Sequence, residues 1–303
     1  MISRHIALLM SLAVVAAGCG EASGSPSTSN AGYRVVATTS LFADLARLAL
    51  GDAVQIDAIV PAGIDVHTFE PAPSDVSTIA GADLVLMNGL GLDDWVVSLV
   101  DAAQQGDANV LRLGEGLEGY GFKYLLDGDG VRDPHVWLDP SAAEIFLQQI
   151  ASRVVEDRPS LTTVVRAALD EGRASLRAQS QAAQIAFSAI PEARRTIVTF
   201  HDAFGYYARA YGITVVGVAV AAPGQDPSAR EIAALIDAIR AAGVTTIFSE
   251  VQFPSKVLDS IAAETGATVL ADLYSDALGA APGDTYLGAM QANATAIAES
   301  MQP

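Results

Sequence analysis

Three histidines in this chain stand where their side chains can meet and do chemistry. His67 and His201 each follow a strand-like run, VQIDAIV and TIVTF, and His135 precedes a helix start in DPHVWLDP. Imidazole is the commonest neutral metal ligand, and clustered histidines suit Zn²⁺ or a similar borderline ion. A single histidine in such a loop is more often a surface or capping residue. Three at strand–helix junctions together predict a metal site.

An acidic side chain from one of the last strands is expected to complete this site. Asp272 directly follows the run ATVLA, and Glu250 directly follows TTIFS. In open parallel α/β sheets, ligands bind beyond the carboxyl ends of the strands, where both acids would lie. Either carboxylate could instead cap the helix that follows. The local pattern leaves both as candidates.

Other acids are candidates for holding the imidazole rings in place. A ligating histidine normally donates its second ring N–H to a carboxylate or a carbonyl. Asp133, Asp202 and Glu250 are the nearby acids, and Glu250 is the strongest candidate because it would lie near Asp272. Asp133 and Asp202 could equally cap a turn or face water. Asp139, followed by a proline, is predicted to cap a helix.

These residues must be positioned by alternating strands and helices. Short aliphatic runs separated by amphipathic stretches are typical of buried strands in parallel sheets, and the alternation predicts an α/β fold. The predicted strands are YRVVAT (33–38), VQIDAIV (54–60), ADLVLMN (82–88), TIVTF (196–200), ITVVGV (213–218), TTIFS (245–249) and ATVLA (267–271).

One long helix is predicted in the middle of the chain. Residues 160–190 contain good helix formers and no proline, and Pro191 ends the segment. About thirty helical residues would span roughly 45 Å, which indicates a rigid connector. We therefore divide the body into an N-terminal α/β lobe (33–159), the connecting helix (160–190) and a C-terminal α/β lobe (191–303).

The N-terminal segment has the pattern of a lipoprotein leader. Residues 1–18 combine Arg4 with a short apolar run typical of a signal peptide, and Cys19, the only cysteine, follows small residues as in a bacterial lipobox. An ordinary signal peptide is the alternative. A lipidated Cys19 would anchor the protein to the membrane. Residues 19–32, rich in Gly, Ser, Thr and Pro, are expected to be a flexible tether.

The composition and the missing motifs argue against several classes of function. The formal net charge is −18, which argues against nucleic-acid binding and against docking on anionic lipid through a basic patch. The sequence contains no GxGxxG, P-loop, GxSxG or HExxH motif. The common signatures of nucleotide-binding proteins and hydrolases are therefore missing.

An ordered set of segments resembles the zinc and manganese solute-binding proteins of ABC transporters, the ZnuA and TroA type. The match runs from about residue 33 to residue 299. The segments are PAGIDVHTFEP, DPHVWLDP, TFHDAFGYYARAYG, DPSAREIAAL, IFSEVQF, LADLYSD and TYLGAMQANATAIA. The resemblance implies two Rossmann-like lobes with parallel sheets, joined by one long helix, with a metal site between the lobes. It also implies His67, His135, His201 and Asp272 as the ligands.

The resemblance and the donor set favour zinc over manganese. In this family, zinc receptors tend to have histidine at the third ligand and manganese receptors glutamate; this chain has His201. Three imidazoles and one carboxylate suit tetrahedral Zn²⁺, whereas Mn²⁺ prefers more oxygen ligands. The chain departs from the family at Val66, where proline is usual, and it lacks the histidine-rich loop of many zinc receptors.

The leading hypothesis is an extracytoplasmic, lipid-anchored, monomeric receptor that delivers Zn²⁺ to an ABC permease and its ATPase and does no chemistry itself. The alternative is a secreted zinc hydrolase in which the three histidines hold the metal, water is the fourth ligand and Glu250 is the general base. A fourth protein ligand would exclude the hydrolase, and an open position beside Glu250 would favour it. A lipid-anchored adhesin would rest on surface location alone.

Overall fold

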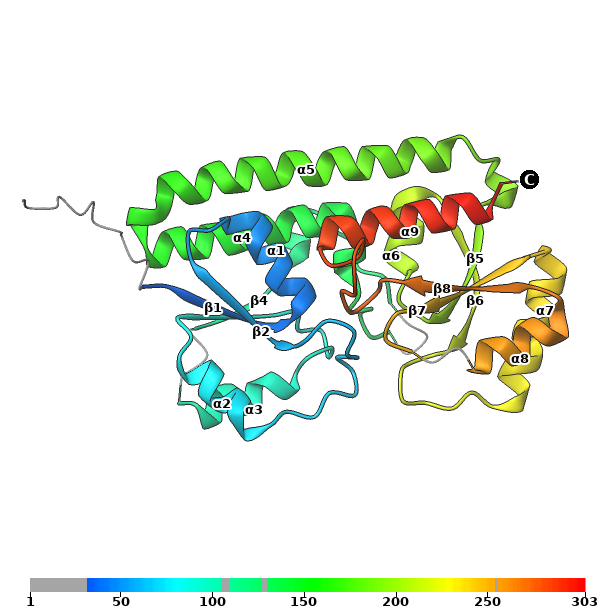
Figure 1. Cartoon of the computed structure of the whole chain (residues 1–303), viewed down its shortest axis with the longest axis horizontal. Helices are drawn as coiled ribbons and strands as arrows, with labels where there is room; N and C mark the ends of the chain where they lie inside the picture. The colour runs from blue at the N-terminus through cyan, green and yellow to red at the C-terminus, as the bar shows by residue number, and fades with distance from the viewer. Residues whose placement is uncertain (1–31, 105–108, 127–129, 254–255, 303) are drawn as a thin grey trace, which may run out of the picture.

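The chain forms two α/β lobes that share a layer of long helices, as seen in a computed structural model (Figure 1). The structure describes residues 32–104, 109–126, 130–253 and 256–302; the side chains of residues 271 and 272 lie outside this description. The predicted signal peptide, Cys19 and almost all of the predicted tether lie outside the described residues.

The N-terminal lobe is built on one parallel sheet with strand order β2-β1-β3-β4. Its strands are β1 (Arg34–Thr39), β2 (Gln55–Val60), β3 (Leu84–Met87) and β4 (Val110–Arg112). The short helices α2 (Pro73–Ala80) and α3 (Trp95–Ala102) cover one face, and α1 (Ser40–Leu50) covers the other (Figure 1). β1 and β3 are almost wholly buried, as expected for central strands covered on both faces.

The C-terminal lobe contains two parallel strand pairs that lie side by side. β5 (Thr196–His201) pairs with β6 (Thr214–Val220), β7 (Thr246–Glu250) pairs with β8 (Thr268–Leu273), and β5 lies next to β7. The helices of this lobe are α6 (Gly205–Tyr211), α7 (Ala229–Ala242) and α8 (Lys256–Thr265). α7 and α8 pack together beside these strands (Figure 1).

Three long helices connect the lobes: α4 (Pro140–Asp157), α5 (Thr162–Ser188) and α9 (Tyr286–Ser300). α5 extends over both lobes and packs against α1, α4 and α9 (Figure 1). Its 27 residues correspond to about 40 Å of helix. Gly172 lets α5 approach α1 closely, because a Cβ there would lie 2.2 Å from the carbonyl oxygen of Leu48.

The structure contains a strand or helix at every segment for which we predicted one. The long helix is two residues shorter at each end than predicted, because residues 159–161 form a 3₁₀ turn and Pro191 follows soon after the helix. The short strand β4 is an addition to the prediction. β8 runs to Leu273, two residues beyond the predicted ATVLA, and this difference matters at the site below.

The largest hydrophobic cluster extends across both lobes, and Trp137 lies within it. The Trp137 ring is 1% exposed and packs edge-on against Phe42, with ring centroids 5.3 Å apart. Its Nε1–H donates to the carbonyl oxygen of Ser275 at 2.8 Å, and its own carbonyl accepts from the Tyr286 hydroxyl at 2.7 Å. Among the described helices, none is long and apolar enough to cross a membrane.

Candidate metal centre

His67, His135, His201 and Asp276 converge between the lobes. One ligand atom from each lies within 4.8 Å of all the others. Asp276 is 3.4 Å from His67 Nε2, 3.5 Å from His135 Nε2 and 3.1 Å from His201 Nε2. Tetrahedral zinc with bonds of about 2.0–2.1 Å separates its ligand atoms by about 3.3 Å. The three distances from Asp276, two from Oδ2 and one from Oδ1, are close to this value.

His67 lies in the segment between β2 and α2. The Asp65 carboxylate shapes this turn by accepting from the backbone N–H groups of His67 and Thr68, at 3.1 and 3.2 Å, and from the Thr68 hydroxyl at 2.6 Å. This local pattern is an Asx turn, which aspartate favours. The turn directs the imidazole toward the site between the lobes.

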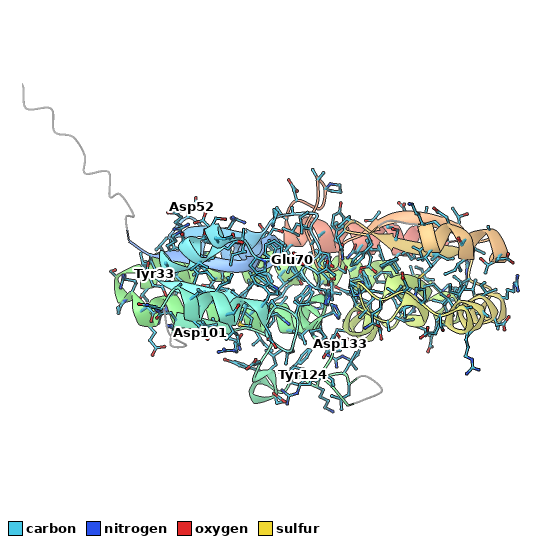
Figure 2. All side chains as sticks on the ribbon, turned by 90° about the horizontal axis from the view of Figure 1, so that it is seen from below. Tyr33, Asp52, Glu70, Asp101, Tyr124 and Asp133 are labelled. Carbon is cyan, nitrogen blue, oxygen red and sulfur yellow. The ribbon has the colours of Figure 1, made fainter. Side chains whose placement is uncertain are left out.

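His135 is positioned by its own neighbours in DPHVWLDP. The Asp133 carboxylate accepts from the His135 backbone N–H at 2.9 Å and contacts ring atom Nδ1 at 2.7 Å. Asp139 caps α4 as predicted, because its side chain accepts from the Ser141 backbone N–H and hydroxyl. Figure 2 shows Asp133, and Glu70 from the segment that carries His67, near the junction of the two lobes.

His201 is the last residue of β5, and Glu250 is the last residue of the adjacent strand β7. Glu250 accepts from the His201 backbone N–H at 3.0 Å, and its second oxygen lies 2.7 Å from His201 Nδ1. With Nδ1 of both His135 and His201 against a carboxylate, their Nε2 atoms face the centre of the site, 3.3 Å apart, where an ion could bind both. Asp202, the third acid considered, is exposed and lines the cavity beside the site.

The acid that the structure brings to the three imidazoles is Asp276, whereas the sequence prediction named Asp272. The prediction ended the strand at residue 271, which made Asp272 the first residue beyond it. Because β8 continues to Leu273, the chain turns toward the histidines only afterwards, and Asp276 reaches them. The Asp272 side chain lies outside the described residues. Both aspartates belong to LADLYSD, and the strand ends two residues later than predicted.

Burial and neighbouring charges shift the pKa in opposite directions at both His201 and Asp276. Burial lowers the pKa of His201, but the Asp276 and Glu250 carboxylates outweigh burial and hold this pKa well above its usual value. Burial raises the pKa of Asp276, but the imidazoles of His201 and His135 outweigh it and hold this pKa well below its usual value. The carboxylate is thus ionised, and a cation is favoured among these four side chains.

Among the described residues, three buried atoms of these four side chains have no hydrogen-bond partner: Nδ1 of His201, which lies 2.7 Å from a Glu250 oxygen, and two atoms at the centre, Nε2 of His67 and Oδ1 of Asp276. Buried polar atoms normally have a partner, and atoms without one call for an explanation. A divalent cation bound to both atoms at the centre would supply it. A cavity of about 540 Å³, lined in part by all three histidines, adjoins the cluster and offers a path to solvent.

Two α/β lobes joined by a long helix, with three imidazoles and a carboxylate between them, define a metal-binding receptor of the two-lobed type. The family model for ZnuA, described as the periplasmic component A of a zinc-uptake complex, matches residues 35–300. The chain belongs to this family, whose members are metal-binding substrate-binding proteins of ABC transporters rather than enzymes. The hydrolase alternative gains no support from it.

Named relatives extend over nearly the whole chain. The manganese-binding lipoprotein MntA of Halalkalibacterium halodurans is 27% identical over 288 residues, 94% of each chain. The manganese ABC transporter substrate-binding lipoprotein ScaA of Streptococcus gordonii is 28% identical over 98% of each chain. The iron ABC transporter substrate-binding lipoprotein MtsA of Streptococcus pyogenes is 27% identical over 88% of each chain.

Solved structures show the same fold. A crystal structure of ZnuA superposes with a TM-score of 0.78 at 27% identity, over 89% of this chain and all of that one. A manganese-bound periplasmic metal-binding protein from Candidatus Liberibacter asiaticus superposes with a TM-score of 0.79 at 22% identity, with the same coverage. The predicted two-lobed α/β architecture is confirmed.

Proposed function

We propose that this protein is the extracytoplasmic receptor of an ABC importer and that Zn²⁺ is its preferred cargo. The observation that carries the proposal is the donor set, three imidazoles and one carboxylate within 4.8 Å of one another. Nitrogen-rich, four-coordinate sites suit zinc, whereas manganese prefers more oxygen atoms and a higher coordination number. His67, His135, His201 and Asp276 are the proposed ligands.

Manganese is the second candidate cargo, because the names of two of the relatives favour it. At 27% and 28% identity, those proteins need not share this chain's donor set. The choice of cargo therefore rests on the four side chains of this site. Replacing one imidazole by a carboxylate would be the simplest way to make such a site richer in oxygen.

The proposed cellular setting follows from the family and from the leader sequence. The quoted relatives are lipoproteins of metal transporters, in agreement with a signal peptide before Cys19 and a lipid anchor on that residue. The receptor would capture the ion outside the cytoplasmic membrane as a monomer and deliver it to a permease driven by a cytoplasmic ATPase. Glu250 would hold the His201 ring rather than act as a base, because it lies against Nδ1.

The test is metal content after purification, followed by competitive titration of Zn²⁺ against Mn²⁺ on the wild type and on His201→Ala. The wild type should bind one Zn²⁺ per chain and prefer zinc by about 100-fold or more, in line with the general order of affinities. His201→Ala should lose tight zinc binding and stay folded by circular dichroism. Equal affinity for the two ions, or tight binding by the variant, would contradict the proposal.

Most protein sites bind Zn²⁺ more tightly than Mn²⁺. A second variant must therefore show that residue 201 itself contributes to the preference for zinc. His201→Glu is the appropriate comparison, because it keeps four ligands and replaces one nitrogen by oxygen. Its ratio of zinc to manganese affinity should fall by at least about tenfold relative to the wild type. An unchanged ratio would mean that residue 201 does not set the metal preference.

A further inference from the structure

Three of the four proposed ligands are fastened to one another by buried hydrogen bonds. The segment that carries His135 is held to the C-terminal lobe, because the Trp137 Nε1–H donates to the Ser275 carbonyl at 2.8 Å. The Tyr206 hydroxyl on α6 also donates to the carbonyl of Asp133, at 3.0 Å. The Asn88 side-chain amide of the N-terminal lobe donates to the Pro134 carbonyl at 3.0 Å, so the segment that carries His135 is held from both lobes.

The same frame holds His201 and Asp276. Glu250 accepts from the His201 backbone N–H and from the Ser275 hydroxyl. The Gln252 side-chain amide donates to the Ser275 hydroxyl at 2.7 Å and lies 3.3 Å from Asp276 Oδ2. His135, His201 and Asp276 therefore share one set of buried supports, and we call these three residues the platform.

His67 stands apart from the platform. Its side chain is 19% exposed, against 5%, 1% and 0% for His135, His201 and Asp276. Its Nε2 lies 3.4 Å from Asp276 Oδ2, and among the described ion pairs no carboxylate lies against its Nδ1, in contrast to His135 and His201. The Asx turn at Asp65 holds only the His67 backbone.

The segment that carries His67 is attached to the Asp276 segment at one point before the histidine. The backbone N–H of Gly63 donates to the carbonyl of Leu278 at 2.7 Å. Beyond this point the backbone is held by the bonds within its own turn and by Val66, which is fully buried in the hydrophobic core, so the freedom lies in the His67 side chain rather than in the backbone. His67 also lines the cavity that leads to solvent. Rotation of this one side chain would open the site without breaking any bond of the platform.

We propose that the ion binds first to the platform of His135, His201 and Asp276, and that His67 is the last ligand to bind and the first to leave. This inference rests on the proposed metal-binding function. A three-ligand site with one open position exchanges its fourth ligand readily, whereas a site closed by four protein ligands holds its ion. His67 therefore controls the release of the ion more than its capture.

The test compares His67→Ala with His135→Ala in the full mature chain. Zinc affinity is measured by competition with a chelating dye, and the rates of binding and release by stopped flow. His67→Ala should bind one Zn²⁺ with an affinity lower by about 10–100-fold, nearly all of it through faster release and with association within about threefold of the wild type. His135→Ala should lose more than about 1000-fold, because it removes part of the platform.

The results separate a failure of the proposed order of ligand binding from a failure of the proposed metal-binding function. If His67→Ala loses as much affinity as His135→Ala, or loses it through slower association, the order of binding proposed here is wrong. If the wild type binds no transition-metal ion, the proposed function itself fails. Should His135→Ala fail to fold by circular dichroism, the pair His67→Gln and His135→Gln replaces it with the same expected order.

Discussion

At the scale of single residues, the site depends on carboxylates that act in two different ways. Asp276 faces the Nε2 atoms of the three imidazoles and supplies the negative charge that a cation requires. Asp133 and Glu250 face Nδ1 of His135 and His201 instead. They set which nitrogen of each ring is free, and such partners usually matter for affinity by 10–100-fold.

The first prediction separates two neighbouring aspartates. Asp276→Asn removes the charged ligand and should weaken zinc binding by more than about 100-fold, beyond the loss typical of an outer partner. Asp272→Asn is the matched control, four residues away, and should leave the affinity within about threefold. Isothermal titration of both variants checks this. The reverse order of effects would restore Asp272 as the ligand and exclude Asp276.

The second prediction concerns Glu250 as a positioning residue. Glu250→Gln keeps the size of the side chain but removes the charge beside His201 Nδ1. Zinc affinity should fall by about 10–100-fold while the stoichiometry stays at one ion per chain. Glu144→Gln is the control, because Glu144 is a half-buried acid of α4 that pairs with Arg177 of α5, and it should leave zinc affinity unchanged. Complete loss of binding in Glu250→Gln would instead make Glu250 a direct ligand.

The structure brings together the three histidines that the sequence analysis grouped, and it adds Asp276, which the sequence analysis did not name. The histidines are the only ones after residue 5, so their types alone drew attention to them. The candidates for the acid were Asp272 and Glu250, and Asp276 was not among them, because recognising it required the end of β8. Strand ends are set by tertiary packing and by pairing with β7, which local periodicity does not contain.

At the scale of elements, the loop after β3 holds an unusual buried acid. Asp93 is fully buried and accepts from the Thr38 hydroxyl at 2.6 Å and from the backbone N–H groups of Asn88 and Gly89, both at 2.8 Å. Burial outweighs these hydrogen bonds and raises the pKa of Asp93 to about 6. The residue thus ties the end of β1 to the loop after β3 and titrates above the normal range of aspartate.

The third prediction is a pH dependence of stability at Asp93. Because its pKa is higher in the folded state than in the unfolded state, its contribution is fully present at low pH and is lost as pH rises through about 6. Between pH 4.5 and 7.5, the metal-free wild type should lose about 2 kcal/mol relative to Asp93→Asn. Urea unfolding of both proteins at the two pH values checks this. A constant difference between them would contradict it.

The fourth prediction tests the contact between Trp137 and Ser275. Trp137→Phe removes the Nε1–H and leaves a buried carbonyl without its donor. This should lower the free energy of unfolding by about 1–3 kcal/mol in urea denaturation. Trp95→Phe is the matched control, since Trp95 Nε1 has no partner among the described residues, and it should cost at least about 1 kcal/mol less. Equal costs would show that this hydrogen bond contributes little.

Most strands and helices could be predicted because the residues that indicate them lie within or next to each element. Aliphatic runs mark buried strands, the Asp139–Pro140 pair marks the start of α4, and Pro191 marks the end of the segment that contains α5. The contacts that fasten the platform were not predictable. Trp137 and Ser275 are 138 residues apart, and no pattern in the sequence relates such distant partners.

At the scale of the whole molecule, the arrangement suits a receptor. α5 extends over both lobes as one helix, so the lobes are braced along one side while the ligands meet between them (Figure 1). The platform is held by hydrogen bonds that reach the C-terminal lobe, whereas His67 extends from the N-terminal lobe, on a segment that one hydrogen bond joins to Leu278. The net charge of −18 agrees with a protein whose ligand is a cation. The family resemblance predicted two lobes joined by a long helix, whereas the strand and helix patterns alone predicted an α/β fold with a long connecting helix.

The most direct test of the central claim is anomalous diffraction at the zinc absorption edge from crystals of the zinc-loaded protein. We expect one strong peak between the lobes, at about 2.0–2.2 Å from Nε2 of His67, His135 and His201 and from a carboxylate oxygen of Asp276. A peak elsewhere, or an ion at the three imidazoles bound by an acid other than Asp276, would contradict it.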